Sequence, residues 1–417
     1  MTNSILISLI LPDSNIDDLN EEIEEMKLLA QTINYNISIV ETQKRISIDP
    51  STYIGKGKIK GILDKVSMLD IKTIFINDEL KPNHYKNIKK LTKDKIEIID
   101  RTYLILNIFN KNAKTNESRA QVKLATLEYM MPRLTGMWTH LERQMGGIGT
   151  RGGPGEKQIE IDRRIIRNDI KKIKKQLSKI EKHRVNQKKS RNTAFKVSLV
   201  GYTNAGKSSL LKKLSGYNAY IKDQLFATLE TTTKRVKLPE SKQEILLSDT
   251  VGFIRKLPHN LVASFRTTLS EIKDADLIIK VIDMSAKDYE GHIATIENTL
   301  KYLEAHTRPS ILLFNKIDLI NDSNTLNRIN TKYNNPLKVS TIRELMLDDL
   351  MKKIEDIATQ NYKKYSITLS YDKSYLIDYI YKKAVVKQRL DGYENIELKL
   401  LCNKKDYNKI LNKIETE

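Results

Sequence analysis

The fold class of this chain follows from one segment, Lys196-Val-Ser-Leu-Val-Gly-Tyr-Thr-Asn-Ala-Gly-Lys-Ser208. Its first five residues are an apolar run typical of a buried strand, and Gly201 to Ser208 match the pattern G-x-x-x-x-G-K-[ST]. In this pattern backbone N–H groups wrap phosphates at the start of a helix, the lysine reaches the β- and γ-phosphates, and the serine hydroxyl binds Mg²⁺. We therefore expect a phosphate-binding loop between a strand and a helix.

Two further motifs follow in the order that a guanine-nucleotide site requires. Leu247-Ser-Asp-Thr-Val-Gly252 ends a strand at Asp249 and turns at Gly252, which places a carboxylate near Mg²⁺ and a backbone N–H near the γ-phosphate. Asn315-Lys-Ile-Asp318 follows another apolar strand. Its Asp carboxylate accepts from guanine N1–H and the exocyclic amine, a donor pair that adenine lacks. Together the motifs predict a Mg²⁺-dependent P-loop GTPase specific for guanine.

A polar, threonine-rich stretch lies between the first two motifs. Phe226-Ala-Thr-Leu-Glu-Thr-Thr-Thr233 suits an effector loop that is ordered by the γ-phosphate. Thr228 is the predicted second side-chain hydroxyl on Mg²⁺, and Thr231 and Thr232 remain alternatives. The structural alternative for the whole stretch is a threonine-rich edge strand.

The residue after the D-x-x-G motif is Phe253, where many GTPases carry a glutamine that orients water. A phenyl ring cannot orient water, so hydrolysis must rely on backbone groups, bound cations or a partner. We expect slow turnover by the isolated protein. The Asn204 amide oxygen offers a place for K⁺ beside the phosphates. Lys207, Asn204 and Gly252 are the candidate catalytic residues.

The pattern of strands and helices predicts an α/β chain of four parts. We expect an N-terminal parallel α/β domain at 1–112, a long antiparallel helical hairpin at 113–192, a doubly wound P-loop GTPase domain at 193–358, and a small C-terminal α+β domain at 359–417. The N-terminal part alternates β-branched strand runs (Ile5–Leu11, Ile37–Thr42, Ile71–Asn77, Ile96–Asp100) with amphipathic segments (Ile16–Thr32, Lys56–Met68, Asn83–Leu91). The C-terminal part suggests a strand at Ser366–Tyr371, a helix at Tyr375–Ala384, a hairpin around Asp391-Gly392 and a final helix from Asp406.

The hairpin is predicted from two heptad seams that flank a glycine-rich loop. In the first seam, apolar residues from Ala120 to Leu141 are spaced alternately by four and by three residues. The second seam begins at Ile159 with one seven-residue step and then has the same alternating spacing up to Ile180. The intervening Met145-Gly-Gly-Ile-Gly-Thr-Arg-Gly-Gly-Pro-Gly-Glu-Lys-Gln158 has too many glycines to continue either helix. We expect a flexible tip there and a kink at Pro132.

Charge and composition narrow the class of protein. The chain carries a net charge of +20, and the segment 161–191 alone contributes half of it. This clustering favours binding to nucleic acid or an anionic membrane, against the plain alternative of a solvated face. We expect no membrane span, no signal peptide and a cytoplasmic location, because no apolar run is long enough. Cys402 is the only cysteine, which excludes disulfides within one chain, and it fits an apolar position in a C-terminal strand.

The sequence resembles the HflX-type GTPases, a branch of the translation-associated P-loop GTPases. The resemblance covers roughly residues 50 to 345. It rests on family-like signatures beyond the generic motifs: Arg101-Thr-Tyr-Leu-Ile-Leu-Asn-Ile-Phe109, Trp138-Thr-His-Leu-Glu-Arg-Gln144, Gly146-Gly-Ile-Gly-Thr-Arg-Gly-Gly-Pro-Gly-Glu156, Asp162-Arg-Arg164, Phe226-Ala-Thr-Leu229 and Asp249-Thr-Val-Gly-Phe-Ile254. The family's guanine-supporting Ser-Ala loop is Ser340-Thr341 here, which is the one departure.

The resemblance implies GTP and GDP as ligands with Mg²⁺ on Ser208 and Thr228. It implies binding to the large ribosomal subunit and its ribosomal RNA, and splitting of stalled or idle ribosomes under stress such as heat. We expect a monomer. A GTPase of ribosome assembly acting on precursor subunits, and a membrane-associated GTPase, are the alternatives. The predicted nucleotide-binding residues are Gly201, Tyr202, Thr203, Asn204, Ala205, Gly206, Lys207, Ser208, Phe226, Ala227, Thr228, Leu229, Glu230, Asp249, Thr250, Val251, Gly252, Asn315, Lys316, Ile317, Asp318, Ser340 and Thr341.

Overall fold

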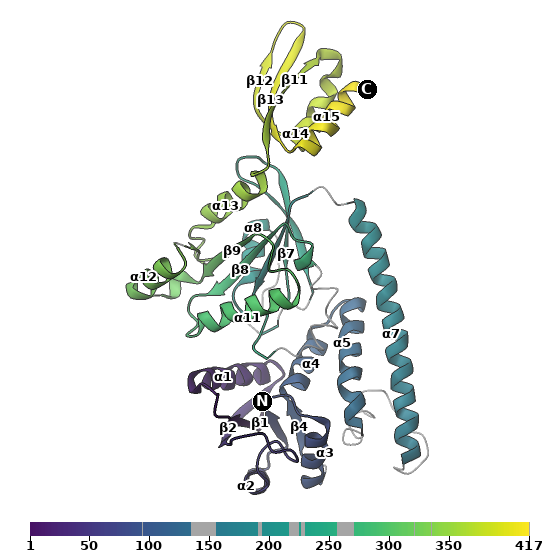
Figure 1. Cartoon of the computed structure of the whole chain (residues 1–417), viewed down its shortest axis with the longest axis vertical. Coiled ribbons are helices and arrows are strands. Elements are labelled where there is room, and N and C mark those ends of the chain that lie inside the picture. Colours follow the sequence, from purple (N-terminus) through teal and green to yellow (C-terminus); the bar gives the residue numbers. More distant parts are fainter. Residues whose placement is uncertain are drawn as a thin grey trace.

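Three sheets follow one another along the molecule, and one long helix runs beside the first two (Figure 1). The computed structural model describes residues 1–93, 95–134, 156–190, 194–216, 225–226, 230–256, 271–320, 322–334 and 336–416. None of the helices in these ranges is both long and apolar enough to cross a membrane. The α/β fold class predicted from the sequence is confirmed: a parallel N-terminal sheet is followed along the chain by a P-loop-type sheet.

The N-terminal sheet is parallel throughout and has the order β2-β1-β3-β4. Its strands are β1 (Thr2–Ile10), β2 (Tyr35–Lys44), β3 (Thr73–Ile76) and β4 (Glu97–Asp100). The helices are α1 (Ile16–Thr32), α2 (Lys56–Met68), α3 (Pro82–Leu91) and α4 (Arg101–Asn112). The centre of β1 is buried without alternation, as expected of a parallel strand covered on both faces. All of these elements except α4 were predicted.

The arm consists of α5 (Asn116–Met130), a 3₁₀ turn η1 (Met131–Arg133) and α7 (Glu156–Ser190). Its seam contains the predicted apolar residues Ala120, Leu124, Leu127, Leu134, Ile166, Ile170 and Ile173. Lys174 pairs with Glu128 across the two helices at 2.8 Å. The turn at Pro132 is the predicted break in the first helix. The glycine-rich loop and Trp138–Gln144 lie outside the described residues.

The central sheet has the order β10-β9-β8-β5-β7-β6, and only β6 runs antiparallel to its neighbour. Its strands are β5 (Lys196–Gly201), β6 (Thr232–Lys237), β7 (Glu244–Asp249), β8 (Leu277–Asp283), β9 (Ser310–Asn315) and β10 (Leu337–Lys338). The helices are α8 (Lys207–Ser215), α11 (Tyr289–Tyr302), η2 (Ile317–Leu319), α12 (Ser323–Lys332) and α13 (Leu347–Thr359). Because β5, β7 and β9 are parallel, all three sequence motifs meet at one edge.

The C-terminal part is a three-stranded antiparallel sheet of order β11-β13-β12 with helices packed on it. It comprises β11 (Lys363–Ser370), η3 (Tyr371–Leu376), α14 (Ile377–Lys383), β12 (Val385–Asp391), β13 (Asn395–Cys402) and α15 (Lys404–Thr416). Burial alternates along β13, so one face of the sheet meets solvent. Cys402 is buried at the end of β13, as predicted.

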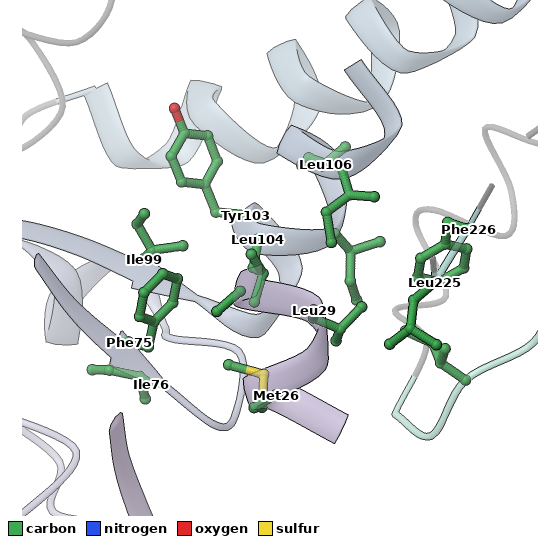
Figure 2. Close-up of a cluster of buried hydrophobic side chains, with 14 of the residues drawn as sticks. Met26, Leu29, Phe75, Ile76, Ile99, Tyr103, Leu104, Leu106, Leu225 and Phe226 are labelled. Atoms are coloured by element: carbon green, nitrogen blue, oxygen red, sulfur yellow. The ribbon is translucent and has the colours of Figure 1, made fainter. Parts of the chain in front are cut away.

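One hydrophobic cluster continues from the N-terminal sheet into the central domain. Figure 2 shows Leu225 and Phe226 beside the helix that carries Leu106. The ring of Phe226 meets that of Phe109 edge to face, with 4.8 Å between centroids. The N-terminal part therefore packs directly against Leu225 and Phe226, which follow the phosphate-binding loop in the sequence.

Candidate functional site

The loop from Gly201 to Lys207 forms the cradle predicted for phosphates. A Cβ at Gly206 would come within 2.2 Å of the Asn315 side chain, and Gly206 has a φ of 92°. A Cβ at Gly201 would lie 2.4 Å from the Val281 carbonyl oxygen. Only glycine fits at these two positions, which lets the backbone turn tightly before α8 begins. Backbone N–H groups at the start of α8 can then bind an anion, as helix N-termini do.

Lys207 is held at the base of this cradle. Its Nζ donates to the carbonyl oxygens of Gly201 (3.1 Å) and Tyr202 (2.7 Å), and the side chain is buried. Burial lowers the pKa of Lys207 to about 8, although the Asp249 carboxylate acts in the opposite direction. An ammonium group has three donors. Two point to carbonyls, and an anionic phosphate beside the third would offset the cost of burying the charge.

Ser208 and Asp249 form the oxygen pair expected at a Mg²⁺ site. The Ser208 hydroxyl donates to Asp249 Oδ2 at 2.6 Å, and Asp249 is buried at the end of β7. No group of three or more His, Cys, Asp or Glu in the described ranges could hold a metal alone. A hydroxyl, a carboxylate and phosphate oxygens are hard donors of the kind Mg²⁺ prefers, so the residues fit this ion. Thr228 lies outside the described residues, and Thr232 pairs with Asp249 at the start of β6.

The D-x-x-G segment lies against the phosphate-binding loop. A Cβ at Gly252 would come within 2.8 Å of the Thr203 Cα, so the two backbones are in close contact. Phe253 donates its N–H to Gly201 O at 3.0 Å, and its carbonyl accepts from Thr203 N–H at 2.9 Å. The Phe253 side chain is buried. The Phe253 side chain therefore contributes to the hydrophobic core. In this segment, the groups that can contact a phosphate or a water are those of the backbone on either side of Phe253.

The predicted guanine end is joined to the phosphate loop through Asn315. Its amide nitrogen donates to Ala205 O at 2.9 Å, while its oxygen accepts from the Thr341 N–H (3.1 Å) and hydroxyl (2.8 Å). The Ser340 hydroxyl donates to Asp318. Threonine in place of the family's alanine thus keeps the backbone contact and adds a hydrogen bond to the same oxygen. In this arrangement Asp318 is partly exposed, so its carboxylate is accessible to a guanine base.

A buried cluster joins the phosphate-binding loop to the N-terminal domain. The Tyr202 hydroxyl donates to Glu25 and accepts from the Arg255 N–H at 2.8 Å, and its ring stacks on His292 at 3.8 Å. Arg101 donates to Glu25 and to the Arg255 carbonyl (3.2 Å). Burial raises the pKa of Glu25 and outweighs the opposite effect of Arg101. Tyr202 was predicted as a nucleotide-binding residue of the loop, and the sequence did not reveal its contacts with the other members of the cluster.

The residues after Phe253 reach an acidic face of α1. Arg255 pairs with Asp288 and, at 3.0 Å, with Glu21, while Lys256 pairs with Glu22 at 2.7 Å. Further partners are Asp18 for Arg255 and Asp78 for Lys256. One sequence signal could have found this face: the carboxylates of Asp18, Glu21, Glu22 and Glu25 recur at helical spacing.

Two residues predicted to bind the nucleotide also contact the helices before and within the arm, Phe226 at the end of α4 and Glu230 at the start of α5. The Glu230 carboxylate accepts from Lys114 N–H, Thr115 N–H and the Ser118 hydroxyl, at the N-terminus of α5. The Phe226 carbonyl accepts from Asn112. Ala227 and Leu229 lie outside the described residues. Asn204 is exposed at a φ of 61°, and its role toward K⁺ stays a prediction.

Comparison with known proteins identifies the family. Residues 20–110 match "GTP-binding GTPase N-terminal", residues 112–191 match "GTP-binding GTPase Middle Region", and residues 196–316 match "50S ribosome-binding GTPase". The "GTPase HflX" of Caldanaerobacter subterraneus subsp. tengcongensis is 40% identical over 385 residues, which is 92% of this chain and 87% of that relative. The chain belongs to the HflX family of GTPases.

A further HflX relative supports this family assignment. That of Escherichia coli is 41% identical over 304 residues, covering 72% of this chain and 70% of its own length. Among solved structures, a GTP-binding protein from Sulfolobus solfataricus in complex with GDP is 27% identical with a TM-score of 0.42, over 86% of this chain and 99% of that one. The resemblance inferred from the sequence is confirmed, and the chain is a GTP hydrolase with a P-loop fold.

Proposed function

We propose that this HflX-family GTPase binds the large ribosomal subunit through its basic arm and couples GTP binding and hydrolysis to the splitting or rescue of stalled or idle ribosomes. The proposal joins two observations. The central domain matches a family described as a 50S ribosome-binding GTPase. The helix α7 of the arm runs beside that domain (Figure 1), and it carries a dense row of exposed cations.

The arm is the observation that carries the proposal. On α7 the face away from α5 exposes Arg164, Arg167, Lys171, Lys172, Lys175, Lys179 and Lys182. Its apolar face is packed on α5, so the cations project from a rigid two-helix support. Lysine and arginine at such spacing neutralise RNA phosphates and release counterions, which makes binding strongly salt-dependent. An exposed apolar stripe, which insertion into a lipid surface would need, is not seen on the described part of α7.

The proposal gives each residue of the nucleotide site a task. Lys207 and the loop backbone bind the phosphates, Ser208 and Thr228 hold Mg²⁺, and Asp318 selects guanine. When bound, Mg²⁺ neutralises charge that develops on the phosphates. Gly252 offers its N–H to the γ-phosphate, and the buried phenyl ring of Phe253 cannot orient water. Turnover by the free protein is therefore slow, and the ribosome supplies the missing group.

Sedimentation with purified mature large subunits tests the proposal. We expect binding that is tighter with a non-hydrolysable GTP analogue than with GDP and that weakens steeply with salt. Lys171→Ala with Lys175→Ala should lower the slope of log K against log salt by about two, because two phosphate contacts are lost. Lys352→Ala with Lys353→Ala, an exposed pair on α13, is the matched control.

Release of subunits from intact ribosomes by the GTP-bound protein would support splitting. Binding to precursor large subunits alone would show a role in assembly instead. Equal salt slopes for the arm and control variants would contradict the role given to α7.

A further inference from the structure

The segment that leads into β6 is fastened to the first turn of the arm by one carboxylate. Glu230 Oε1 accepts from the Thr115 N–H at 2.7 Å, the Lys114 N–H at 2.9 Å and the Ser118 hydroxyl at 2.7 Å. Thr115 is itself the N-cap residue of α5 and accepts from the Ser118 N–H. Glu230 therefore acts as an additional cap supplied by a residue more than one hundred positions away in the chain.

This carboxylate is well placed to stay ionised. Burial works against the charge, but the hydrogen bonds from Ser118, Thr115 and Lys114 outweigh it and lower the pKa of Glu230. A negative charge is also favoured by the partial positive charge at a helix N-terminus. The contact is thus a charge-assisted one, stronger than a neutral hydrogen bond of the same geometry.

A second contact fastens the same segment on its other side. Phe226 is buried, its ring packs edge to face on Phe109, and its carbonyl accepts from the Asn112 side chain at 2.8 Å. Phe109 and Asn112 belong to α4, which leads directly into α5. Phe226 is therefore attached to α4 and Glu230 to the first turn of the arm, and in the sequence these two residues lie on either side of the centre of the stretch predicted to respond to the γ-phosphate.

Glu230 lies close in the sequence to a strand that contacts the predicted Mg²⁺ site. Two residues further along, Thr232 begins β6 and pairs with Asp249, whose carboxylate accepts from Ser208. In the other direction α5 is packed on α7 along their apolar seam and through the Lys174–Glu128 ion pair. A displacement at Glu230 would thus be passed to both helices of the arm, because packed helices move as units.

We propose that Glu230 couples the nucleotide site to the basic arm, so that the preference of the arm for ribosomal RNA in the GTP state depends on this carboxylate. The inference rests on the proposed function and names its regulation. Glu230 is a positioning residue in this scheme, since its carboxylate acts through its contacts with the first turn of the arm. Coupling between two sites requires such a physical link and acts equally in both directions.

The test compares Glu230→Gln with Glu244→Gln. Glu244 is an exposed glutamate at the start of the neighbouring strand β7, where its carboxylate accepts from Arg235 at 3.0 Å, so it offers the same loss of charge away from the arm. For each protein the Kd for mature large subunits is measured with a GTP analogue and with GDP, together with the Kd for each nucleotide in the absence of subunits.

We expect the ratio of the GDP to the GTP-analogue Kd to fall about fivefold or more in Glu230→Gln and to be unchanged in Glu244→Gln. Ser118→Ala removes one partner from the arm side and should lower the ratio less, with normal nucleotide affinity. If Glu230→Gln is poorly folded by circular dichroism, Ser118→Ala carries the test.

The outcomes separate the two proposals. No binding of the wild-type protein to large subunits would overturn the proposed function. Wild-type binding that depends on the nucleotide, together with the same dependence in Glu230→Gln and Ser118→Ala, would overturn the coupling role alone. A loss of nucleotide affinity in Glu230→Gln without subunits would also overturn it, because it would place the carboxylate in the nucleotide site.

Discussion

Two parallel sheets in this chain offer the same kind of edge to entirely different partners. In the central sheet, the edge where β5 and β7 end carries the glycine loop, Lys207 and Asp249. In the N-terminal sheet, the edge where β3 ends is followed by Asp78, which pairs with Lys256 of the central domain. Carboxyl ends of parallel strands are where such sheets usually bind ligands.

The difference lies in the residues and not in the topology. The central edge combines close-fitting glycines with a buried lysine, and it suits an anion. The N-terminal edge and the adjoining α1 present a group of carboxylates, and they bind the arginine and lysine that follow the D-x-x-G motif. A sheet therefore supplies the position of a site, while side-chain charge decides what occupies it. Three variants test this contrast.

The largest effect is expected at the central edge. Lys207→Ala removes the charge-assisted contact that the third donor of its ammonium group would make to phosphate, worth about 1.5 to 3 kcal/mol, so kcat/KM for GTP should fall by roughly tenfold to a hundredfold. Release of phosphate from GTP gives the rate. Lys213→Ala, an exposed lysine on the same helix that pairs with Glu344, is the control and should keep wild-type turnover. A folded Lys207→Ala variant with unchanged kcat/KM would show that this edge is not the nucleotide site.

A smaller effect is expected at the acidic edge. Arg255→Ala with Lys256→Ala leaves the α1 carboxylates without their partners and should lower the free energy of unfolding of the N-terminal part by about 1 to 3 kcal/mol. The midpoint of urea unfolding measures this change. Arg389→Ala, which breaks an exposed pair with Asp391 in the C-terminal domain, should have little effect. Equal shifts in the two proteins would mean that the edge contact contributes no more than an ordinary surface pair.

The finest comparison concerns pH and Asp100, which ends β4 and caps α4. Burial raises the pKa of Asp100 to about 6, against the effect of hydrogen bonds from the Tyr103 and Leu80 N–H groups. The folded state then binds this proton more tightly than the unfolded chain does. The resulting stability is present below about pH 4, is lost as the pH rises through about 6, and amounts to about 3 kcal/mol at most.

Asp100→Asn cannot titrate and keeps an oxygen for the Tyr103 N–H. The difference in free energy of unfolding between wild type and variant should therefore change between pH 4 and pH 7 and stay constant above pH 7. Urea titrations across this range provide the measurement. A constant difference throughout would assign Asp100 an ordinary pKa.

Much of the fold was predictable because its elements carry periodic patterns. The strands and helices of the N-terminal part and the seam of the arm follow from alternation, β-branched runs and heptads. The helix α4 was not predicted, because almost all of its residues from Arg101 to Phe109 are buried. A helix covered on every side has no apolar stripe to find in the sequence.

The candidate site divides in the same way. The phosphate loop, Asp249 and Asn315 were found from spacing within single segments. The contacts of Tyr202 with Glu25, of Arg255 with α1 and of Glu230 with α5 were not, because spacing does not reveal which faces of separate domains meet. Thr341 shows a further limit: only the structure reveals that its hydroxyl strengthens the contact with Asn315.

Cys402 has a practical consequence for work on this protein. It is the single cysteine, it lies in the C-terminal core, and burial raises its pKa to about 11. Thiolate is the form that reacts with maleimides and peroxides, and almost none exists at neutral pH with such a pKa. The native chain thus gives oxidants little sulfur to attack at this position. A pair of cysteines introduced on the surface would accept fluorescent labels selectively, without first removing the natural one.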